Sequence, residues 1–308
     1  MNKEVIFEKL KSIHKSLRKP SNIDFESLNG TLYVTMTEKG ITSNMQNNES
    51  AFEGWAIAIK AALPDIATRV VVRWETPSSK KTHYIRFLYR IRCFVMSYEW
   101  ASFECLDNTA KNDYETVSNE IKEWVTNYPS TEASKEAAHE EAQLERALND
   151  RLPGVHDHQL PVGLFYKEVS KRAEHERTPS GGSQIDLWSI TDETFTVYEL
   201  KKDDNRLVGI VSELMFYVNV IKDLVDGVIS FGKGAENIDI RNYKEVYKNI
   251  NEKKIKKVVG VFLANYLHPI LTLNRKEFFS ILNENKRKIE YKQNVFNFVI
   301  IKIANIIE

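Results

Sequence analysis

A twenty-residue stretch, SQIDLWSITDETFTVYELKK (183–202), constrains the fold of this chain more than any other part of its 308 residues. β-Branched and aromatic residues fill two runs on either side of a polar dipeptide at 192–193, which is the pattern of a β-hairpin. Folding the hairpin about that dipeptide places Asp186 directly opposite Glu199, on one face and about 5 Å apart at Cβ. Because side chains alternate along a strand, Lys201 shares that face. The register therefore predicts two acids and a lysine at the end of the hairpin far from the turn.

The two faces of the predicted hairpin are otherwise mostly apolar. The acidic face continues towards the turn with Trp188, Ile190, Phe195 and Val197, and the other face carries Ile185, Leu187, Tyr198 and Leu200. Downstream, an apolar helical pattern at 209–225 is followed by strand patterns at 227–232, 256–264 and 295–303. Strands that alternate with helices imply a sheet covered on both faces, so we expect an α/β fold.

The three charged side chains suggest a chemistry. Two carboxylates side by side repel each other, and a divalent cation removes the repulsion. Mg²⁺ prefers oxygen ligands from one or two carboxylates, completed by water and phosphate oxygens. A lysine beside such a metal can orient or activate an attacking water. The set therefore predicts metal-assisted hydrolysis of a phosphodiester; the alternative is a salt-bridged cluster at the end of a sheet.

The stretch GGSQIDLWSI…FTVYELKK resembles the PD-(D/E)XK nuclease superfamily, which includes many restriction endonucleases. The likeness lies in a glycine-rich approach, an apolar strand with aspartate, a hairpin, an apolar strand ending in Glu-x-Lys, and a following helix. It covers roughly residues 132–308. It implies that Asp186, Glu199 and the carbonyl of Leu200 bind Mg²⁺, with Mn²⁺ as a substitute, and that Lys201 positions or activates the water. Ile185 stands where the family pattern has a proline.

The resemblance also implies roles for two helices. The family core opens with a helix that points a glutamate at the metal, and EAQLERAL places Glu141 in that position, with Leu144 and Leu148 packing towards the sheet. Glu145 is the competing choice. The helix after the hairpin often carries Gln followed four residues later by Tyr, and here the pattern reads Glu213 and then Tyr217.

A change of pattern near residues 128–133 divides the chain into two expected domains. Pro129 breaks regular structure there, and a helical pattern at 134–152 follows. We expect residues 1–130 to form a separate α+β domain that recognises substrate or mediates dimerisation. Residues 131–308 are expected to form a restriction-endonuclease-like core, a mixed β-sheet flanked by helices. Within the first domain the patterns predict helices at 1–17, 49–63 and 113–128, and strands at 30–37, 68–75 and 82–98.

An arginine pattern in the first domain suggests contact with nucleic acid. If KKTHYIRFLYRIR is a strand, Arg86, Arg90 and Arg92 share one face, and guanidinium groups in a row can bind successive phosphates. The alternative is the solvated face of a half-buried strand. The lysine-rich groups at 253–257 and 286–288 could also line a groove, although such runs are usually solvated helix faces.

Other candidate groups carry less information. His156 and His158 lie two apart in a predicted loop, where surface histidines are more common than a zinc site. Arg172 and His175, just before the hairpin, are expected to be solvated. No P-loop, dinucleotide-binding or serine-hydrolase pattern is present, so no nucleotide cofactor is expected.

Composition agrees with an intracellular enzyme. Lys+Arg and Asp+Glu both number 43, so net charge draws the chain neither to DNA nor to a membrane. The N-terminus lacks a signal-peptide pattern, the C-terminal apolar run is too short to span a bilayer, and two cysteines build no disulfide framework. We therefore expect a cytoplasmic protein without membrane contact.

The sequence thus favours a Mg²⁺-dependent endonuclease that acts on DNA, as in restriction or defence. A homodimer is expected, because cutting both strands usually takes two active sites. Two alternatives stay open. One is a nuclease fold without activity that serves as a DNA-binding or assembly module, and the other is a nuclease that acts on RNA or branched DNA.

Overall fold

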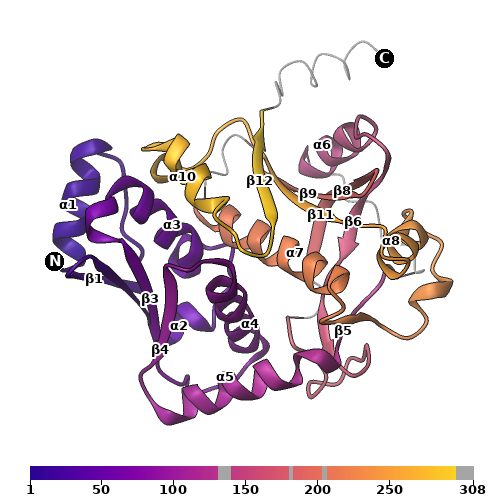
Figure 1. The fold of residues 1–308 in the computed structure, drawn as a ribbon, viewed down its shortest axis with the longest axis horizontal. Coiled ribbons are helices and arrows are strands. Elements are labelled where there is room, and N and C mark those ends of the chain that lie inside the picture. The colour runs from indigo at the N-terminus through magenta and orange to yellow at the C-terminus, as the bar shows by residue number, and fades with distance from the viewer. Residues whose placement is uncertain (131–139, 180–182, 203–206, 296–308) are drawn as a thin grey trace. The chain divides into compact units, whose positions relative to one another are not determined.

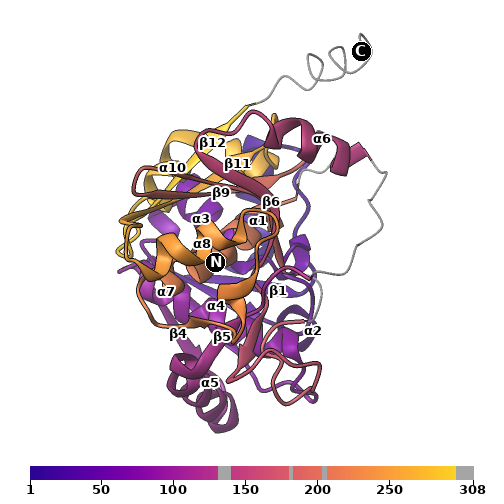
Figure 2. The same ribbon diagram turned by 90° about the vertical axis from the view of Figure 1, so that its right-hand side faces the viewer.

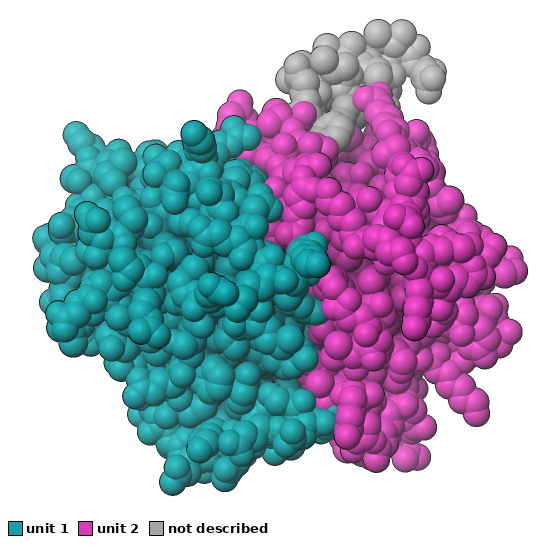
Figure 3. Space-filling view, in the orientation of Figure 1, with its two compact units in different colours: residues 1–120, 207–216, 267–288 teal, residues 121–206, 217–266, 289–308 magenta. Residues whose placement is uncertain are grey.

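The structure is a computed structural model that describes residues 1–130, 140–179, 183–202 and 207–295 (Figures 1 and 2). It divides into two compact units, coloured separately in Figure 3. Unit 1 comprises Met1–Glu120, Leu207–Phe216 and Leu267–Lys288, and unit 2 comprises Ile121–Arg206, Tyr217–Tyr266 and Ile289–Glu308. This division differs from the single boundary expected near residue 130, because two later segments belong to unit 1.

Unit 1 is built on a four-stranded sheet in the order β1-β2-β3-β4. β1 and β2 form an antiparallel hairpin whose turn residues, Asn29 and Gly30, both have positive φ, the backbone that favours a twisted two-residue turn. β2, β3 and β4 run parallel, so each connection must cross over the sheet. The strands are β1 (Ile23–Leu28), β2 (Thr31–Met36), β3 (Arg69–Trp74) and β4 (Ala101–Cys105).

Helices make these crossovers. The α-helices of unit 1 are α1 (Lys3–Ile13), α2 (Glu38–Ile41), α3 (Phe52–Ala62), α4 (Thr82–Ser97), α5 (Asn108–Glu120), α9 (Pro269–Thr272) and α10 (Arg275–Leu282). Two 3₁₀ helices, η1 (Asn48–Ser50) and η2 (Pro64–Ile66), flank α3. The expected helices at 1–17 and 49–63 are confirmed by α1 and α3, and the strands at 30–37 and 68–75 by β2 and β3. The helix expected at 113–128 exists as α5 but ends before a short strand.

The strand predicted at 82–98 is wrong: these residues form helix α4. β-Branched and aromatic residues suggested a strand, but the buried side chains recur at helical spacing, as Tyr84, Phe87, Leu88, Ile91 and Phe94. The decisive constraint is non-local, because the parallel strands β3 and β4 need a crossover, and α4 supplies it.

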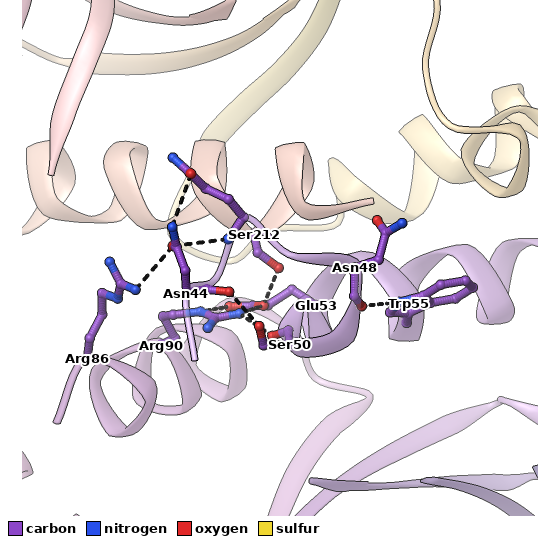
Figure 4. Close-up of polar contacts among 9 residues, drawn as sticks. Asn44, Asn48, Ser50, Glu53, Trp55, Arg86, Arg90 and Ser212 are labelled. Atoms are coloured by element: carbon purple, nitrogen blue, oxygen red, sulfur yellow. Dashed lines mark hydrogen bonds and ion pairs between the residues drawn. The ribbon is translucent and has the colours of Figure 1, made fainter. Parts of the chain in front are cut away.

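A buried polar cluster joins α3, α4 and the first part of α7 (Gly209–Val225) within unit 1 (Figure 4). Arg90 and Glu53 are each nearly inaccessible, and Arg90 Nε donates to Glu53 Oε1 at 2.8 Å. Ser212 Oγ donates to the other carboxylate oxygen at 2.6 Å, and Arg90 Nη2 donates to the carbonyl of Ser50 at 3.2 Å. Glu53 is therefore a charge held inside the unit by a bidentate arginine and a hydroxyl.

Unit 2 holds a five-stranded sheet in the order β12-β11-β9-β8-β6 and a small sheet in the order β10-β5-β7. Its strands are β5 (Trp124–Thr126), β6 (Val155–Pro161), β7 (Leu164–Tyr166), β8 (Gln184–Thr191), β9 (Thr194–Leu200), β10 (Ser230–Phe231), β11 (Lys257–Leu263) and β12 (Ile289–Asn294). β6, β8 and β9 are antiparallel neighbours, whereas β9, β11 and β12 run parallel. Its helices are α6 (Glu140–Asn149), the second part of α7, α8 (Tyr243–Asn251), and the 3₁₀ helices η3 (Ile121–Glu123) and η4 (Ala235–Asn237).

Helices cover both faces of the large sheet, as the alternating pattern predicts (Figure 2). On one face, Leu148 of α6 packs with Leu187, Tyr198 and Leu200. On the other, Gly260 of β11 lets α7 approach, since a Cβ on Gly260 would lie 3.0 Å from Val218 Cγ1. The expected α/β class is confirmed at this level.

Some predictions for the rest of unit 2 are confirmed, and others are wrong. The hairpin and the helix at 209–225 are confirmed, and β10 and β11 fall within the strands expected at 227–232 and 256–264. β6 was missed, because a loop was expected there, and β12 lies where the patterns predicted no strand. The strand expected at 295–303 lies almost wholly outside the described residues. No described helix is long and apolar enough to cross a membrane.

The buried ion pair of unit 1 gives a first test. Replacing Glu53 by Gln leaves the Arg90 guanidinium buried without its counter-charge, which costs about 3 kcal/mol of unfolding free energy. Urea denaturation measures the change. The matched control is Glu104→Gln in the more exposed Arg73–Glu104 pair, where we expect a loss below about 1 kcal/mol. Equal effects of the two substitutions would contradict the assigned burial.

Asp107, directly before α5, gives a pH-dependent test. Its Oδ2 accepts from Thr76 N at 2.7 Å and its Oδ1 from Ala110 N at 2.8 Å, and these N–H donors hold the pKa of the carboxyl below its ordinary value. A lowered folded pKa stabilises the protein above the unfolded value of about 4, and this stabilisation is lost as pH falls through the folded pKa.

Asp107→Ala should therefore cost about 1 kcal/mol at pH 7, and the difference from wild type should shrink in acid. Thermal unfolding followed by circular dichroism between pH 7 and 2 measures it. Glu115→Ala, an exposed site on the same helix, is the control and should change little at any pH. If the destabilisation caused by Asp107→Ala does not depend on pH, the charged carboxylate of Asp107 does not stabilise the start of α5.

Candidate active site

The hairpin has the register that the sequence predicts. β8 and β9 pair Thr191 with Thr194 and Leu187 with Tyr198, and the same register brings Asp186 opposite Glu199. At that point the described ladder ends, and Asp186 Oδ2 instead accepts the backbone N–H of Leu200 at 2.9 Å. The side chain of Asp186 thus reaches across the open end of the hairpin to the residue after Glu199.

Glu199 and Lys201 lie against each other at the end of β9. The ammonium of Lys201 contacts Glu199 Oε1, and its backbone N–H donates to the carbonyl of Leu263 on β11 at 3.1 Å. Glu199 is 0% exposed and pairs in register with Phe262, whereas Asp186 is half-buried. A fully buried carboxylate, a half-buried carboxylate and a lysine therefore meet where β9 leaves the sheet.

The packing explains why these three side chains share a face. Stacked rings of Trp188 and Phe195, with centroids 5.9 Å apart, continue the acidic face towards the turn. Val197 on that face pairs with Gly260, where α7 packs. The acidic face is thus dry and covered along most of its length, and polar side chains appear only at its end.

Helix α6 supplies one described glutamate on the sheet-facing side. Leu144 and Leu148 pack towards the sheet, as the resemblance implies, and Glu145 is buried on the same helix, 7% exposed. Glu141 lies one turn earlier on α6, and its side chain falls outside the described residues. Glu145 therefore lies on the inner side of the helix, and the choice between the two glutamates stays a prediction.

Glu213 and Tyr217 both occur on α7 and are both buried. The carboxylate of Glu213 contacts Gln46 Nε2 within unit 1, whereas Tyr217 belongs to unit 2. Glu213 therefore links the start of α7 to the loop before η1 through its contact with Gln46.

The arginine surface predicted for DNA does not have the expected geometry. Because α4 is a helix, Arg86, Arg90 and Arg92 do not form a row on a strand. Arg86 and Arg90 are each 4% exposed, and Arg86 Nη2 lies 2.8 Å from His83 Nδ1. Burial and the neighbouring Arg86 and Arg90 lower the pKa of His83 to about 4, so this ring is neutral at pH 7 and can accept from Arg86.

The histidine pair lies on the edge strand β6. His156 Nδ1 lies 2.9 Å from the carbonyl of Gly154, and His158 Nδ1 lies 3.0 Å from Asp157 Oδ1. His175 Nδ1 lies 2.9 Å from the carbonyl of Tyr166, and Arg172 is exposed as expected. In the part of the chain that the structure describes, no three His, Cys, Asp or Glu side chains gather to hold a metal.

The structure places further residues beside the acids that sequence reasoning missed. Gln159 lies on β6 between His158 and Leu160, which pair with the two neighbours of Asp186, and Arg241, before α8, donates to the carbonyl of Gln159. Residues 155–161 read VHDHQLP, with a proline and two histidines and little β-branched content, so no pattern pointed to a strand. Residue 241 joins this edge only through the tertiary fold, which leaves no local signal.

The donor set fits a magnesium site of the kind that two carboxylates make. Asp186 and Glu199 supply carboxylate oxygens at one strand end, the carbonyl of Leu200 lies between Glu199 and Lys201, and solvent reaches Asp186. Mg²⁺ needs no more than one or two carboxylates from protein, because water and phosphate complete its shell. Chemically, the arrangement can hold a hard cation and present an ammonium beside it.

The contact of Lys201 with Glu199 can be tested without substrate. Lys201→Met keeps the length of the side chain but leaves Glu199 buried without that cation, so we expect a loss of about 2 kcal/mol in EDTA. The double variant Glu199→Gln/Lys201→Met should regain part of the loss, as urea denaturation would measure. If the single and double variants are equally unstable, the ion pair does not form in solution.

Comparisons with known proteins add no relative. No protein-family model matches the chain, and neither a curated protein nor a solved structure matches it. The candidate site is therefore characterised by its own residues, Asp186, Glu199 and Lys201, and by the strand ends that bring them together.

Proposed function

We propose that this protein is a Mg²⁺-dependent nuclease that hydrolyses phosphodiester bonds in DNA. The observation that carries the proposal is the end of the β8–β9 hairpin, where Asp186 reaches Leu200 and Lys201 contacts the buried Glu199. A cluster with only a structural role would have no need of two acids beside a single lysine in a mostly apolar sheet. Carboxylates that lie close together repel each other, and a bound cation removes that repulsion.

The order of elements in unit 2 supports the same proposal. A helix (α6) precedes the strands, the acids lie on adjacent antiparallel strands (β8 and β9), and a helix (α7) and a parallel strand (β11) follow. This is the arrangement that the resemblance to PD-(D/E)XK nucleases implies, with a restriction-endonuclease-like sheet flanked by helices. Restriction or another defence against foreign DNA is the corresponding biological role.

In this proposal each residue has a defined task. Asp186, Glu199 and the carbonyl of Leu200 would hold Mg²⁺, or Mn²⁺ in its place, and Lys201 would orient the attacking water. The water oxygen would bond to phosphorus in line with the leaving oxygen, the bond to that oxygen would break, the water proton would pass to solvent, and the leaving oxygen would take a proton from solvent. When bound, Mg²⁺ supplies the positive charge that balances the acids and polarises the phosphate. Glu141, or Glu145 in its place, would assist from α6.

The N-terminal residues would then recognise the substrate or form the contact between two copies in a homodimer. The proposal gives no DNA-binding task to Arg86 or Arg90, because their guanidinium groups are buried and hydrogen-bonded inside unit 1. A nuclease that cuts both strands would bring two hairpin sites together.

Cleavage of supercoiled and linear DNA tests the proposal directly. Wild type with Mg²⁺ or Mn²⁺ should cut, and EDTA should abolish cutting. Glu199→Ala and Lys201→Ala should each lose at least about a hundredfold in rate, because each removes a group that acts at the reacting phosphate. Gel electrophoresis of time courses measures the rates.

Matched controls come from the opposite end of the large sheet, at the hairpin turn and just before β11. Glu193→Ala and Lys256→Ala remove the same charges at exposed positions and should cut like wild type. Cutting that survives in Glu199→Ala and Lys201→Ala would show a contaminant or a different site and refute the proposal. If wild type cuts no DNA, RNA or branched DNA but binds Mn²⁺ through Asp186 and Glu199, a binding module is the better description.

A further inference from the structure

The edge strand β6 has an unusual backbone conformation at Gln159, beside Asp186. β6 and β8 are antiparallel partners, with Val155 opposite Ile190 at one end and Pro161 opposite Gln184 at the other. The described pairs do not include Gln159 opposite Asp186, the pair that this register would give. Gln159 has a φ of 51°, a left-handed backbone that is unfavourable for a glutamine inside a strand. Such strain persists only where surrounding contacts impose it, and it concentrates at functional sites.

Arg241 contacts β6 at Gln159. Its Nη1 donates to the carbonyl of Gln159 at 3.4 Å, the one hydrogen bond of this guanidinium among the described residues. Arg241 is half-buried and itself has a φ of 51°, as does its neighbour Asn242 with 49°. Three non-glycine residues in a disfavoured conformation therefore meet at one place.

Asn242 fixes the segment to β6. Its Nδ2 donates to the carbonyl of His156 at 2.9 Å and to Asp157 Oδ2 at 3.2 Å. Asp157 pairs with Trp188, so its side chain leaves β6 on the same face as Asp186 and Glu199. The turn that carries Arg241 is thus anchored on the acidic face of the sheet, one strand away from Asp186.

The guanidinium of Arg241 suits an anionic ligand. A guanidinium has five N–H donors in a fork that matches phosphate oxygens. Arg241 uses one of these donors in its hydrogen bond to Gln159. Neighbouring strands lie about 5 Å apart, so the backbone of Gln159 is one strand spacing from that of Asp186. A phosphate next to the one held at Asp186 and Glu199 would come within reach of the Arg241 side chain.

We propose that Arg241 is a substrate-binding residue that contacts a backbone phosphate flanking the scissile one, with the carbonyl of Gln159 holding its guanidinium in place. The inference rests on the proposed nuclease function and adds the β6 edge as the path of the bound strand. It identifies the ligand as the sugar–phosphate backbone of DNA, since a contact to phosphate alone carries no base specificity.

The competing explanation is that Arg241 only neutralises Asp157. The two predict different outcomes for paired substitutions. If charge balance were its task, Asp157→Asn would make Arg241 dispensable, and the double variant Asp157→Asn/Arg241→Ala would behave like wild type. If Arg241 binds phosphate, the double variant stays as defective as Arg241→Ala.

The experiment measures binding of a fluorescein-labelled 30-base-pair duplex by anisotropy in Ca²⁺ at several salt concentrations, with cleavage in Mg²⁺ measured in parallel. Arg241→Ala should weaken binding about tenfold at low salt and reduce the slope of log affinity against log salt by about 1. It should raise KM more than it lowers kcat. Arg241→Lys should recover part of the affinity, and Lys244→Ala, an exposed charge three residues away, should leave both readouts unchanged.

The outcomes separate this inference from the function beneath it. Unchanged affinity and salt slope in Arg241→Ala, with wild-type thermal stability, overturn the inference even if wild type cuts DNA. Weakened binding in Arg241→Ala while wild type cuts nothing supports the phosphate contact and refutes the nuclease. Wild type that fails to bind the duplex at low salt overturns both, and restored binding in the double variant assigns Arg241 to Asp157 instead.

Discussion

The register of the β8–β9 hairpin is the constraint on which the candidate site depends. A slip of one residue would turn Asp186 onto the face packed against α6 and leave Glu199 without its acidic neighbour. The register is secured by burial, because Leu187 and Tyr198 pack under α6 while Trp188 and Phe195 stack on the opposite face. The apolar residues that stabilise the sheet thus also determine where its charges meet.

Two of the buried glutamates, Glu53 and Glu199, show how similar groups can have different surroundings. Glu53 accepts from both Nε and Nη2 of Arg90 and from Ser212, so its charge is balanced and its oxygens are engaged inside unit 1. Glu199 is as deeply buried, but it lies at a strand end beside a second acid. The oxygens of Glu53 are thus engaged by Arg90 and Ser212, whereas in our proposal Glu199 takes part in binding a divalent cation.

Local patterns predicted the parts of the fold that local forces determine. The hairpin has a two-residue turn and regular alternation, and α7 has a long apolar helical repeat, so both could be predicted with their bounds. Residues 82–98 contain aromatic and β-branched side chains that suit a strand, and only the crossover between β3 and β4 explains the helix. β6 is a strand because it pairs with β8, and no feature of its sequence VHDHQLP predicts that pairing.

The same reasoning explains why burial changes around Asp186. Asp186 is half-buried, although Ile185 and Leu187 beside it are fully buried. Polar groups at such a partly buried position need hydrogen-bond partners. Asp186 itself accepts the N–H of Leu200, and Arg241 donates to the carbonyl of Gln159. Side chains thus supply hydrogen bonds to the backbone at this end of the acidic face, and in our proposal a phosphate would bind there beside the two acids and the guanidinium.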